Sequence, residues 1–154
     1  MADYTTQIDI DAPPEVVFWH LITAQGMLAW MGQRACLEPT PGGRFAMHID
    51  GSEVRGQFVE VDPPHRVVFT WGIVGSDDHP PGSSTVEFTL DAAHGGGTRL
   101  TLTHDRLPER RAAMHARGWT RFLPRLSTAA TAYRQLSPVQ QACGNTERRS
   151  GKNA

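Results

Sequence analysis

Apolar and aromatic side chains recur every three or four residues between positions 109 and 136, and arginines fall mostly on the opposite side. This spacing gathers the two kinds of side chain on opposite faces of a helix. Pro108 suits the first turn, where a missing N–H costs nothing. We therefore predict one long amphipathic helix. Its inward face holds His115, Trp119, Phe122, Leu126, Ala130 and Tyr133.

Gly118 lies inside this predicted helix, although glycine lowers helix stability by about 1 kcal/mol relative to alanine. Close packing against a neighbouring element is the simpler explanation for it. The inward face of this helix, around Gly118, has two interpretations. Either it is ordinary core, or it fills its space only in part and leaves a cavity for a ligand. The sequence supports a cavity but does not name what enters it.

A period of two predicts strands through most of the remaining chain. Residues 4–11 form the first expected strand, and residues 15–22 and 24–30 form two short helices after it. Residues 72–82, rich in glycine and proline, are expected to form a flexible loop. Six further strands are expected before the long helix, at residues 35–38, 43–49, 52–61, 66–71, 84–91 and 98–105.

Two turns determine the pairing of the central strands. The first is Asp50-Gly51, a strong signal for a two-residue hairpin, and the second is a four-residue turn at positions 62–65. Directly opposed residues point to the same face of a sheet. Both turns therefore predict a single aromatic face, in which Gly56 leaves room for the indole of Trp71. That face comprises Phe45, Met47, Phe58, Phe69 and Trp71.

The same register places Glu60 on the aromatic face, near one end, and Val59, Val61 and Val68 on the other face. A β-bulge between positions 58 and 61 would change this assignment, because one extra residue reverses the faces that follow it.

The last predicted hairpin alternates between apolar and polar residues without a break. One of its faces is therefore expected to be buried and the other wet, as in an antiparallel sheet that is covered on one side. The buried face comprises Val86, Phe88, Leu90, Leu100, Leu102 and His104.

Charge is divided unevenly along the chain, although the net charge is only -1. Residues 1–105 carry 14 acidic and 5 basic side chains, whereas residues 106–154 carry 2 acidic and 10 basic ones. A basic helix that sits on an acidic sheet explains this division. A nucleic-acid-binding face is the alternative, but the arginines lack interleaved exposed aromatic residues and a known motif. No nucleic-acid partner is expected.

Length and composition indicate one folded domain at residues 1–137, followed by a polar, disordered tail at residues 138–154. No apolar run approaches the ~20 residues of a membrane span, so no membrane insertion is expected. We also expect no signal peptide, and we expect the protein to be cytoplasmic.

Two histidines and one carboxylate are the candidates for chemistry in a cavity. His104 and His115 both fall on inward faces, where they could anchor a ligand or act as general acid and base. The alternative is two structural histidines with satisfied hydrogen bonds. Glu60 is either a cavity carboxylate or an edge residue that reaches water. No metal cluster, phosphate loop or nucleophile–base pair is visible, so we expect no metal and no cofactor, and catalytic residues are not assigned.

The predicted order of elements accompanies several stretches that resemble the START-like (SRPBCC) superfamily, most closely its branch named after the C-terminal domain of the activator of Hsp90 ATPase. These stretches lie within about residues 5–136 and read IDAPPEVVF, FVEVDPPHRVVFTWG, GSSTVEFTL, GGTRLTLTH and HARGWTRFLPRL.

The resemblance implies an α+β helix-grip fold. In this fold a curved antiparallel β-sheet wraps around a long C-terminal helix, two short helices follow the first strand, and sheet and helix enclose an apolar cavity. Members of the superfamily bind lipids, polyketides and other hydrophobic molecules, and some cyclise or hydrate them. The branch name implies a co-chaperone, a role that we expect to transfer poorly because no further domain precedes the fold.

We therefore expect a protein that binds a hydrophobic small molecule. The rivals are a cyclase- or dehydratase-type enzyme that uses cavity histidines or Glu60, and a co-chaperone or another interaction module. A homodimer is left open. The expected ligand-binding residues are Phe45, Met47, Phe58, Phe69, Trp71, Val86, Phe88, Leu102, His104, His115, Trp119 and Phe122.

Overall fold

The computed structural model of the protein describes residues 2–133, so the predicted tail at residues 138–154 and the last three residues of the predicted long helix lie outside the described part of the chain. The order of the elements agrees with the sequence prediction. They are β1 (Ala2–Ile10), α1 (Pro14–Ile22), α2 (Ala24–Leu28), β2 (Arg34–Leu37), β3 (Arg44–Ile49), β4 (Ser52–Asp62), β5 (Arg66–Trp71), β6 (Ser84–Ala92), the 3-10 turn η1 (His94–Gly96), β7 (Thr98–Leu107) and α3 (Glu109–Tyr133).

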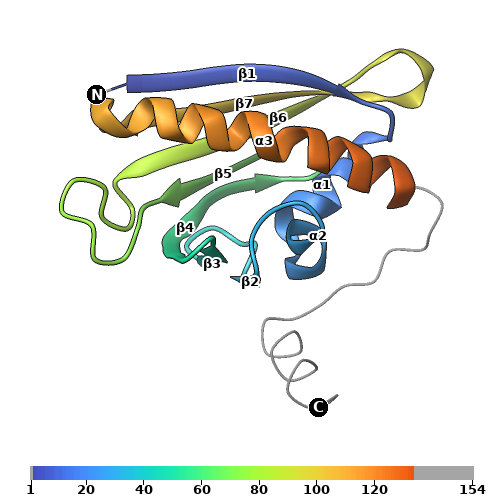
Figure 1. Cartoon of the computed structure of the whole chain (residues 1–154). Coiled ribbons are helices and arrows are strands. Elements are labelled where there is room, and N and C mark those ends of the chain that lie inside the picture. Colours follow the sequence, from blue (N-terminus) through green and yellow to red (C-terminus); the bar gives the residue numbers. More distant parts are fainter. Residues whose placement is uncertain (1, 134–154) are drawn as a thin grey trace.

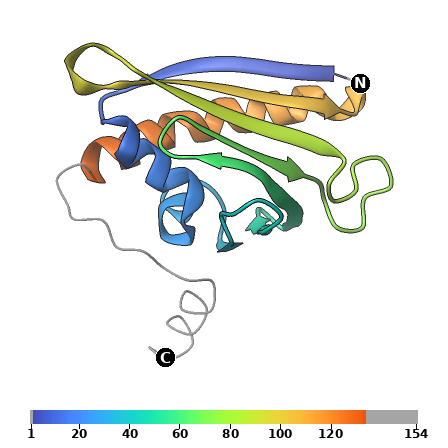
Figure 2. The same cartoon turned by 180° about the vertical axis from the view of Figure 1, so that it is seen from behind.

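Seven strands form one antiparallel sheet in the order β1-β7-β6-β5-β4-β3-β2. Figure 1 shows α3 along one face of the sheet, with α1 close to the C-terminal half of α3. Seen from behind, the sheet lies in front of α3, and the loop between β5 and β6 projects at the end where α3 begins (Figure 2). The predicted helix-grip fold is confirmed.

The Asp50-Gly51 turn forms as predicted. Both residues have positive φ angles, 49° and 88°, as a type I′ hairpin requires. Glycine adopts such angles at no steric cost, and aspartate tolerates them better than most residues. The predicted pairing of Phe45 with Gly56 follows from this turn and is confirmed.

The β4–β5 hairpin contains a β-bulge, the possibility that the sequence left open. Phe58 opposes Phe69 as predicted, but beyond Val59 the register shifts, so that Glu60 opposes Val68 and Val61 opposes Val67. The assignment of Glu60 to the aromatic face is therefore wrong, and so is the outward assignment of Val61, which packs against the core. The Glu60 carboxylate instead accepts a hydrogen bond from the Arg66 guanidinium at 2.7 Å.

The aromatic face forms a closed core. Phe45, Phe58 and Phe69 are at most 1% exposed, and the Phe45 and Phe69 rings stack with centroids 4.0 Å apart. The predicted inward face of the last hairpin is also buried, from Val86 to His104. The centre of the space between sheet and helix is thus filled by side chains.

Gly56 has a different role from the one expected. A Cβ atom at this position would lie 1.9 Å from the carbonyl oxygen of Thr70. Gly56 therefore permits a close approach of two backbones, and it does not leave a space beside Trp71.

The basic helix is paired within the molecule. On α3, Arg110 and Arg111 bind the carboxylate of Asp78, and Arg121 binds that of Asp50. These ion pairs support the intramolecular explanation of the uneven charge. None of the helices in residues 2–133 is long and apolar enough to cross a membrane.

Candidate functional site

An open groove of about 250 Å³ lies between α3 and the β3–β4 hairpin. It is smaller than the ~300 Å³ at which ligand pockets usually begin, and the Phe45–Phe58–Phe69 cluster fills the centre of the fold behind it. One wall comes from α3 and consists of Met114, His115, Gly118, Trp119, Arg121 and Phe122. The opposite wall consists of Met31, Ile49, Asp50, Ser52, Val54, Trp71 and Ile73.

Four of the predicted ligand-binding residues line this groove: Trp71, His115, Trp119 and Phe122. The other eight are at most 1% exposed and pack behind it, so their contact with a ligand stays a prediction. They are Phe45, Met47, Phe58, Phe69, Val86, Phe88, Leu102 and His104.

Sequence reasoning missed the wall that the β3–β4 turn contributes, including Ile49, Ser52 and Val54. The alternation of the two strands and the Asp50-Gly51 turn were visible, but neither tells which helix the tip of the hairpin approaches. The uneven charge was the one signal that pointed to this contact, since it predicts that the basic helix sits on acidic residues. Arg121 of α3 indeed donates to the carboxylate of Asp50, in the β3–β4 turn, at 2.6 Å.

Gly118 opens the groove on the helix side. A Cβ atom at this position would meet nothing within 4 Å, so the expected close packing against a neighbour is wrong. One turn of α3 therefore presents only backbone between the Met114 and Phe122 side chains, and the groove occupies the resulting space.

A chain of hydrogen bonds lies behind the groove and determines which nitrogen of His104 carries the proton. The indole N–H of Trp119 donates to His104 Nδ1 at 3.1 Å, and an indole nitrogen can only donate. Neutral His104 therefore carries its proton on Nε2 and donates it to Ser84 Oγ, 2.9 Å away.

Ser84 joins two histidines to the backbone. Its hydroxyl donates to the carbonyl oxygen of Trp71 at 3.0 Å, so its oxygen accepts from both His104 Nε2 and His79 Nε2, the latter at 2.8 Å. His79 is then left with an acceptor at Nδ1, which is buried without a hydrogen-bond partner. His79 was missed by sequence reasoning, because it lies in a loop without periodicity.

His115 completes the cluster from α3. Its Nδ1–H donates to the backbone oxygen of Arg111 at 3.1 Å, which leaves Nε2 as an acceptor. The ring centroids of His115 lie 5.2 Å from His104 and 5.1 Å from His79. The sequence placed both His104 and His115 on inward faces, and the structure brings their rings into contact.

All three histidines are held in the neutral form. Burial, together with the positive charge that neighbouring histidines would carry, lowers the pKa of His104 to about 2 and that of His79 to about 4. Burial also lowers the pKa of His115. A charged imidazolium in this cluster would lose its hydration, and no unpaired carboxylate nearby would compensate by pairing with its charge.

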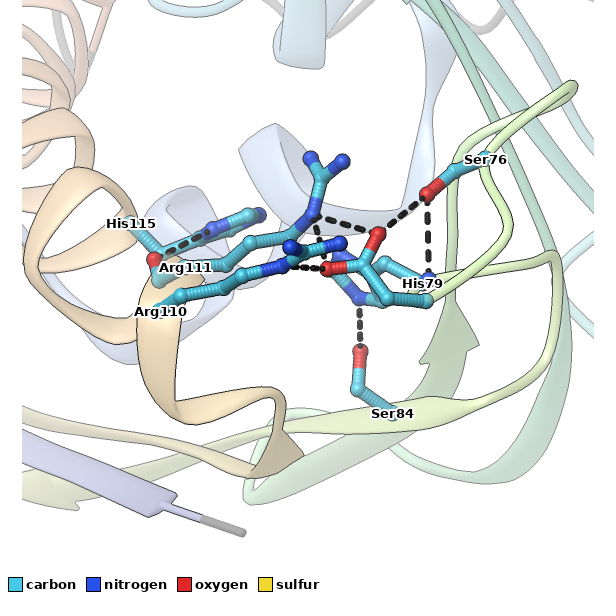
Figure 3. Close-up of polar contacts among 7 residues, drawn as sticks. Ser76, His79, Ser84, Arg110, Arg111 and His115 are labelled. Carbon is cyan, nitrogen blue, oxygen red and sulfur yellow. Dashed lines mark hydrogen bonds and ion pairs between the residues drawn. The ribbon is translucent and has the colours of Figure 1, made fainter.

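The loop that carries His79 is fastened to the start of α3. Figure 3 shows Arg110 and Arg111 converging on one carboxylate of this loop, that of Asp78. These two guanidinium groups hold the pKa of Asp78 well below its usual range. Within the loop, the backbone N–H of Ile73 donates to the oxygen of His79 at 2.8 Å. The expected flexible rim is thus tied to the helix and to itself.

Glu60, the candidate carboxylate, lies away from the groove and pairs with Arg66, as described above. Trp30, which follows α2, is buried in the core and donates its indole N–H to the backbone oxygen of His20. Among residues 2–133, no group of three or more histidine, cysteine or acidic side chains could hold a metal ion.

Comparison with known proteins gives a family and a fold. The family described as Activator of Hsp90 ATPase homolog 1-like protein matches residues 11–131. No functionally curated protein matches the chain.

Many solved structures, among them the following three, are similar to this chain. A Mesorhizobium loti protein is 24% identical, with 83% of this chain and 96% of that chain covered and a TM-score of 0.74. The Aha1 dimer of Colwellia psychrerythraea is 20% identical, with 85% and 97% covered and a TM-score of 0.75. The AHSA1 protein of Silicibacter pomeroyi is 28% identical, with 82% and 96% covered and a TM-score of 0.67.

Proposed function

This chain belongs to the Activator of Hsp90 ATPase homolog 1-like family, and from that premise we propose that it binds an apolar small molecule in the groove between α3 and the β3–β4 hairpin. The observation that carries the proposal is the space over Gly118, which faces apolar side chains across the groove. Ligand sites are mostly apolar concavities with a few polar groups, and their volumes begin at about 300 Å³. At about 250 Å³ the groove lies just below this range, which limits the proposed ligand to one or two rings.

The ligand is proposed to contact the four predicted residues that line the groove, of which Trp71 and Trp119 offer the largest apolar surfaces. The remaining predicted residues support these side chains from behind. For example, the Phe88 ring lies edge-on to Trp119 with centroids 6.0 Å apart.

Titration with naphthalene tests this proposal through tryptophan fluorescence. Naphthalene is expected to quench the emission of the unmodified protein, and Gly118→Leu is expected to abolish the quenching because its side chain fills the groove. Ala113→Leu is the matched control, since Ala113 is an exposed residue of the same helix outside the groove. Equal quenching of all three proteins, or of none, would refute the proposal, provided that circular dichroism shows all three folded.

The enzyme alternative is supported less well. It required His104, His115 or Glu60 to converge on one point, and only the two histidines do so. Both nitrogens of His104 are occupied by hydrogen bonds to Trp119 and Ser84. The groove therefore offers one general base, His115 Nε2, and no general acid to work with it.

An interaction module would need a contiguous exposed apolar patch. In the described part of the chain the large exposed apolar side chains are Val59, Val74 and Met114, which belong to three different segments. No observation therefore favours that role. A homodimer, as in the Colwellia psychrerythraea protein, remains a proposal that light scattering tests.

A further inference from the structure

We propose that the groove selects an uncharged apolar ligand that bears a hydroxyl or N–H group, and that this group donates a hydrogen bond to His115 Nε2. The inference rests on the proposed function, because it specifies the chemistry of the ligand in the same groove.

The first step is that His115 Nε2 is an acceptor that a ligand can reach. The other ring nitrogen donates to Arg111 of the same helix, so Nε2 lies on the edge of the ring that faces away from the helix backbone. Nε2 has no hydrogen-bond partner among residues 2–133, and unlike His79 Nδ1 it is not one of the fully buried polar atoms that lack a partner. His115 itself lines the groove.

The second step is that Nε2 stays unprotonated at neutral pH. Burial, followed by the positive charge of Arg111 on α3, lowers the pKa of His115. The rings that pack against it, His79 in the β5–β6 loop and His104 on β7, are themselves neutral. The nearby carboxylate of Asp78 offers no compensation, since it is already shared by Arg110 and Arg111. His115 therefore presents a lone pair, not an N–H, to the groove.

The third step is the consequence for ligands. A hydroxyl or N–H satisfies this lone pair, an ether does not, and a carboxylate would place a negative oxygen against it. Arg121, the arginine among the residues that line the groove, is already paired with Asp50 at 2.6 Å, so a carboxylate would have to compete with Asp50 for it. The expected order of affinity is hydroxyl first, methyl ether second and carboxylate last.

Three probes of the same shape test this order: naphthol, its methyl ether and naphthoate, each titrated at neutral pH by tryptophan fluorescence. Naphthol is expected to bind about two- to tenfold more tightly than the ether, as one neutral hydrogen bond provides. Naphthoate is expected to bind most weakly. His115→Phe keeps a ring and removes the acceptor, so it is expected to bind naphthol and the ether equally. His65→Phe, which changes an exposed histidine, is expected to keep the preference.

The outcomes separate this inference from the proposed function. If naphthol and the ether bind equally to the unmodified protein and Gly118→Leu abolishes both, the groove binds ligands but the inference is wrong. If no probe binds, both fall. A preference for naphthol that persists in His115→Phe also overturns the inference.

A measurement on the unmodified protein covers the case in which His115→Phe does not fold. The 15N resonance of His115 Nε2 is expected to move when naphthol is added and to stay unchanged with the ether. An unchanged resonance at saturating naphthol would overturn the inference.

Discussion

Two glycines show that the structural role of a glycine depends on what surrounds it. Gly118 faces empty space in the groove, whereas Gly56 lies against the backbone of Thr70 on the neighbouring strand. Both were conspicuous in the sequence, and both were assigned the wrong reason, because a sequence pattern tells that a side chain is missing but not what occupies its place.

Alanine substitutions at these two positions should therefore have opposite effects on stability. Gly118→Ala is expected to raise the free energy of unfolding by roughly 0.5–1 kcal/mol, the difference in helix propensity. Gly56→Ala is expected to lower it by about 1–3 kcal/mol, as for other overpacked sites, because the new Cβ must displace the Thr70 carbonyl. Urea unfolding measures both values, and equal signs would contradict this interpretation.

The contribution of Ser84 to stability also depends on its environment. Ser84→Ala removes the hydroxyl that serves Trp71, His79 and His104, and it should cost about 1–3 kcal/mol, because buried donors lose their acceptor. The adjacent Ser83 is the matched control, since its hydroxyl is buried without a partner. Ser83→Ala is expected to change the unfolding free energy by less than about 0.5 kcal/mol. A comparable loss in both variants in urea melts would speak against the hydrogen-bond network.

At the scale of elements, the β5–β6 loop links the sheet to the helix. The loop is bound to the start of α3 through Asp78 and to β6 through His79. It therefore holds His79 inside the cluster and fixes one end of α3.

Asp78→Asn should loosen this loop without unfolding the protein, because it weakens both arginine contacts. The amides of Ile73 and His79, which are bonded within the loop, are then expected to exchange with deuterium faster than in the unmodified protein. Asp77→Asn makes the same charge change at an exposed neighbour and should leave both rates unaltered. Unchanged exchange in Asp78→Asn would show that the contacts to α3 do not hold the loop.

The elements themselves were largely predictable, and the reasons are local. The Asp50-Gly51 turn fixes the register of β3 and β4 through its backbone angles, and the unbroken alternation of β6 and β7 fixes their buried face. The β4–β5 pairing was only half predictable, since the bulge at Val59 has no unambiguous signature in one sequence. His79 could not be assigned at all, because its burial depends on Ser84 and on two arginines far along the chain.

At the scale of the whole molecule, buried neutral histidines make stability depend on pH. Burial lowers the pKa values of His20, His79, His104 and His115 in the folded protein. In the unfolded chain these residues titrate near 6.5. Below that pH the unfolded chain binds protons that the folded protein does not, so the free energy of unfolding falls as pH falls.

The expected loss begins near pH 6.5. The contribution of His79 ends near pH 4, where it becomes protonated in the folded protein as well, whereas that of His104 continues to about pH 2. Paired carboxylates such as Asp78 act in a different range, because arginine partners lower their pKa and their contribution is lost only below about 3.8. Glu53, whose pKa is lowered from 4.5 by His48 and Arg55, begins to act near the lower end of the interval from pH 6.5 to 4. Urea melts in the upper part of this interval, above about pH 5, should therefore show the histidine effect alone. A stability that stays constant from pH 6.5 to 4 would contradict the burial of these side chains.

His104→Gln isolates one of these groups. It is expected to reduce the pH dependence by about 1.4 kcal/mol per pH unit in the lower half of the interval, which corresponds to one proton fewer bound on unfolding. The exposed His65→Gln should leave the slope as it is. An unaltered slope in His104→Gln would mean that this imidazole takes up a proton without unfolding.

The two indoles at the groove form a pair with optical consequences. The Trp71 and Trp119 rings have centroids 5.6 Å apart and planes inclined by 49°, so their strong ultraviolet transitions are close and not parallel. Exciton coupling between them should produce two adjoining circular-dichroism bands of opposite sign, which Trp119→Phe removes. A molecule that wedges between the rings changes their separation and tilt, and therefore changes the couplet without the need for any label.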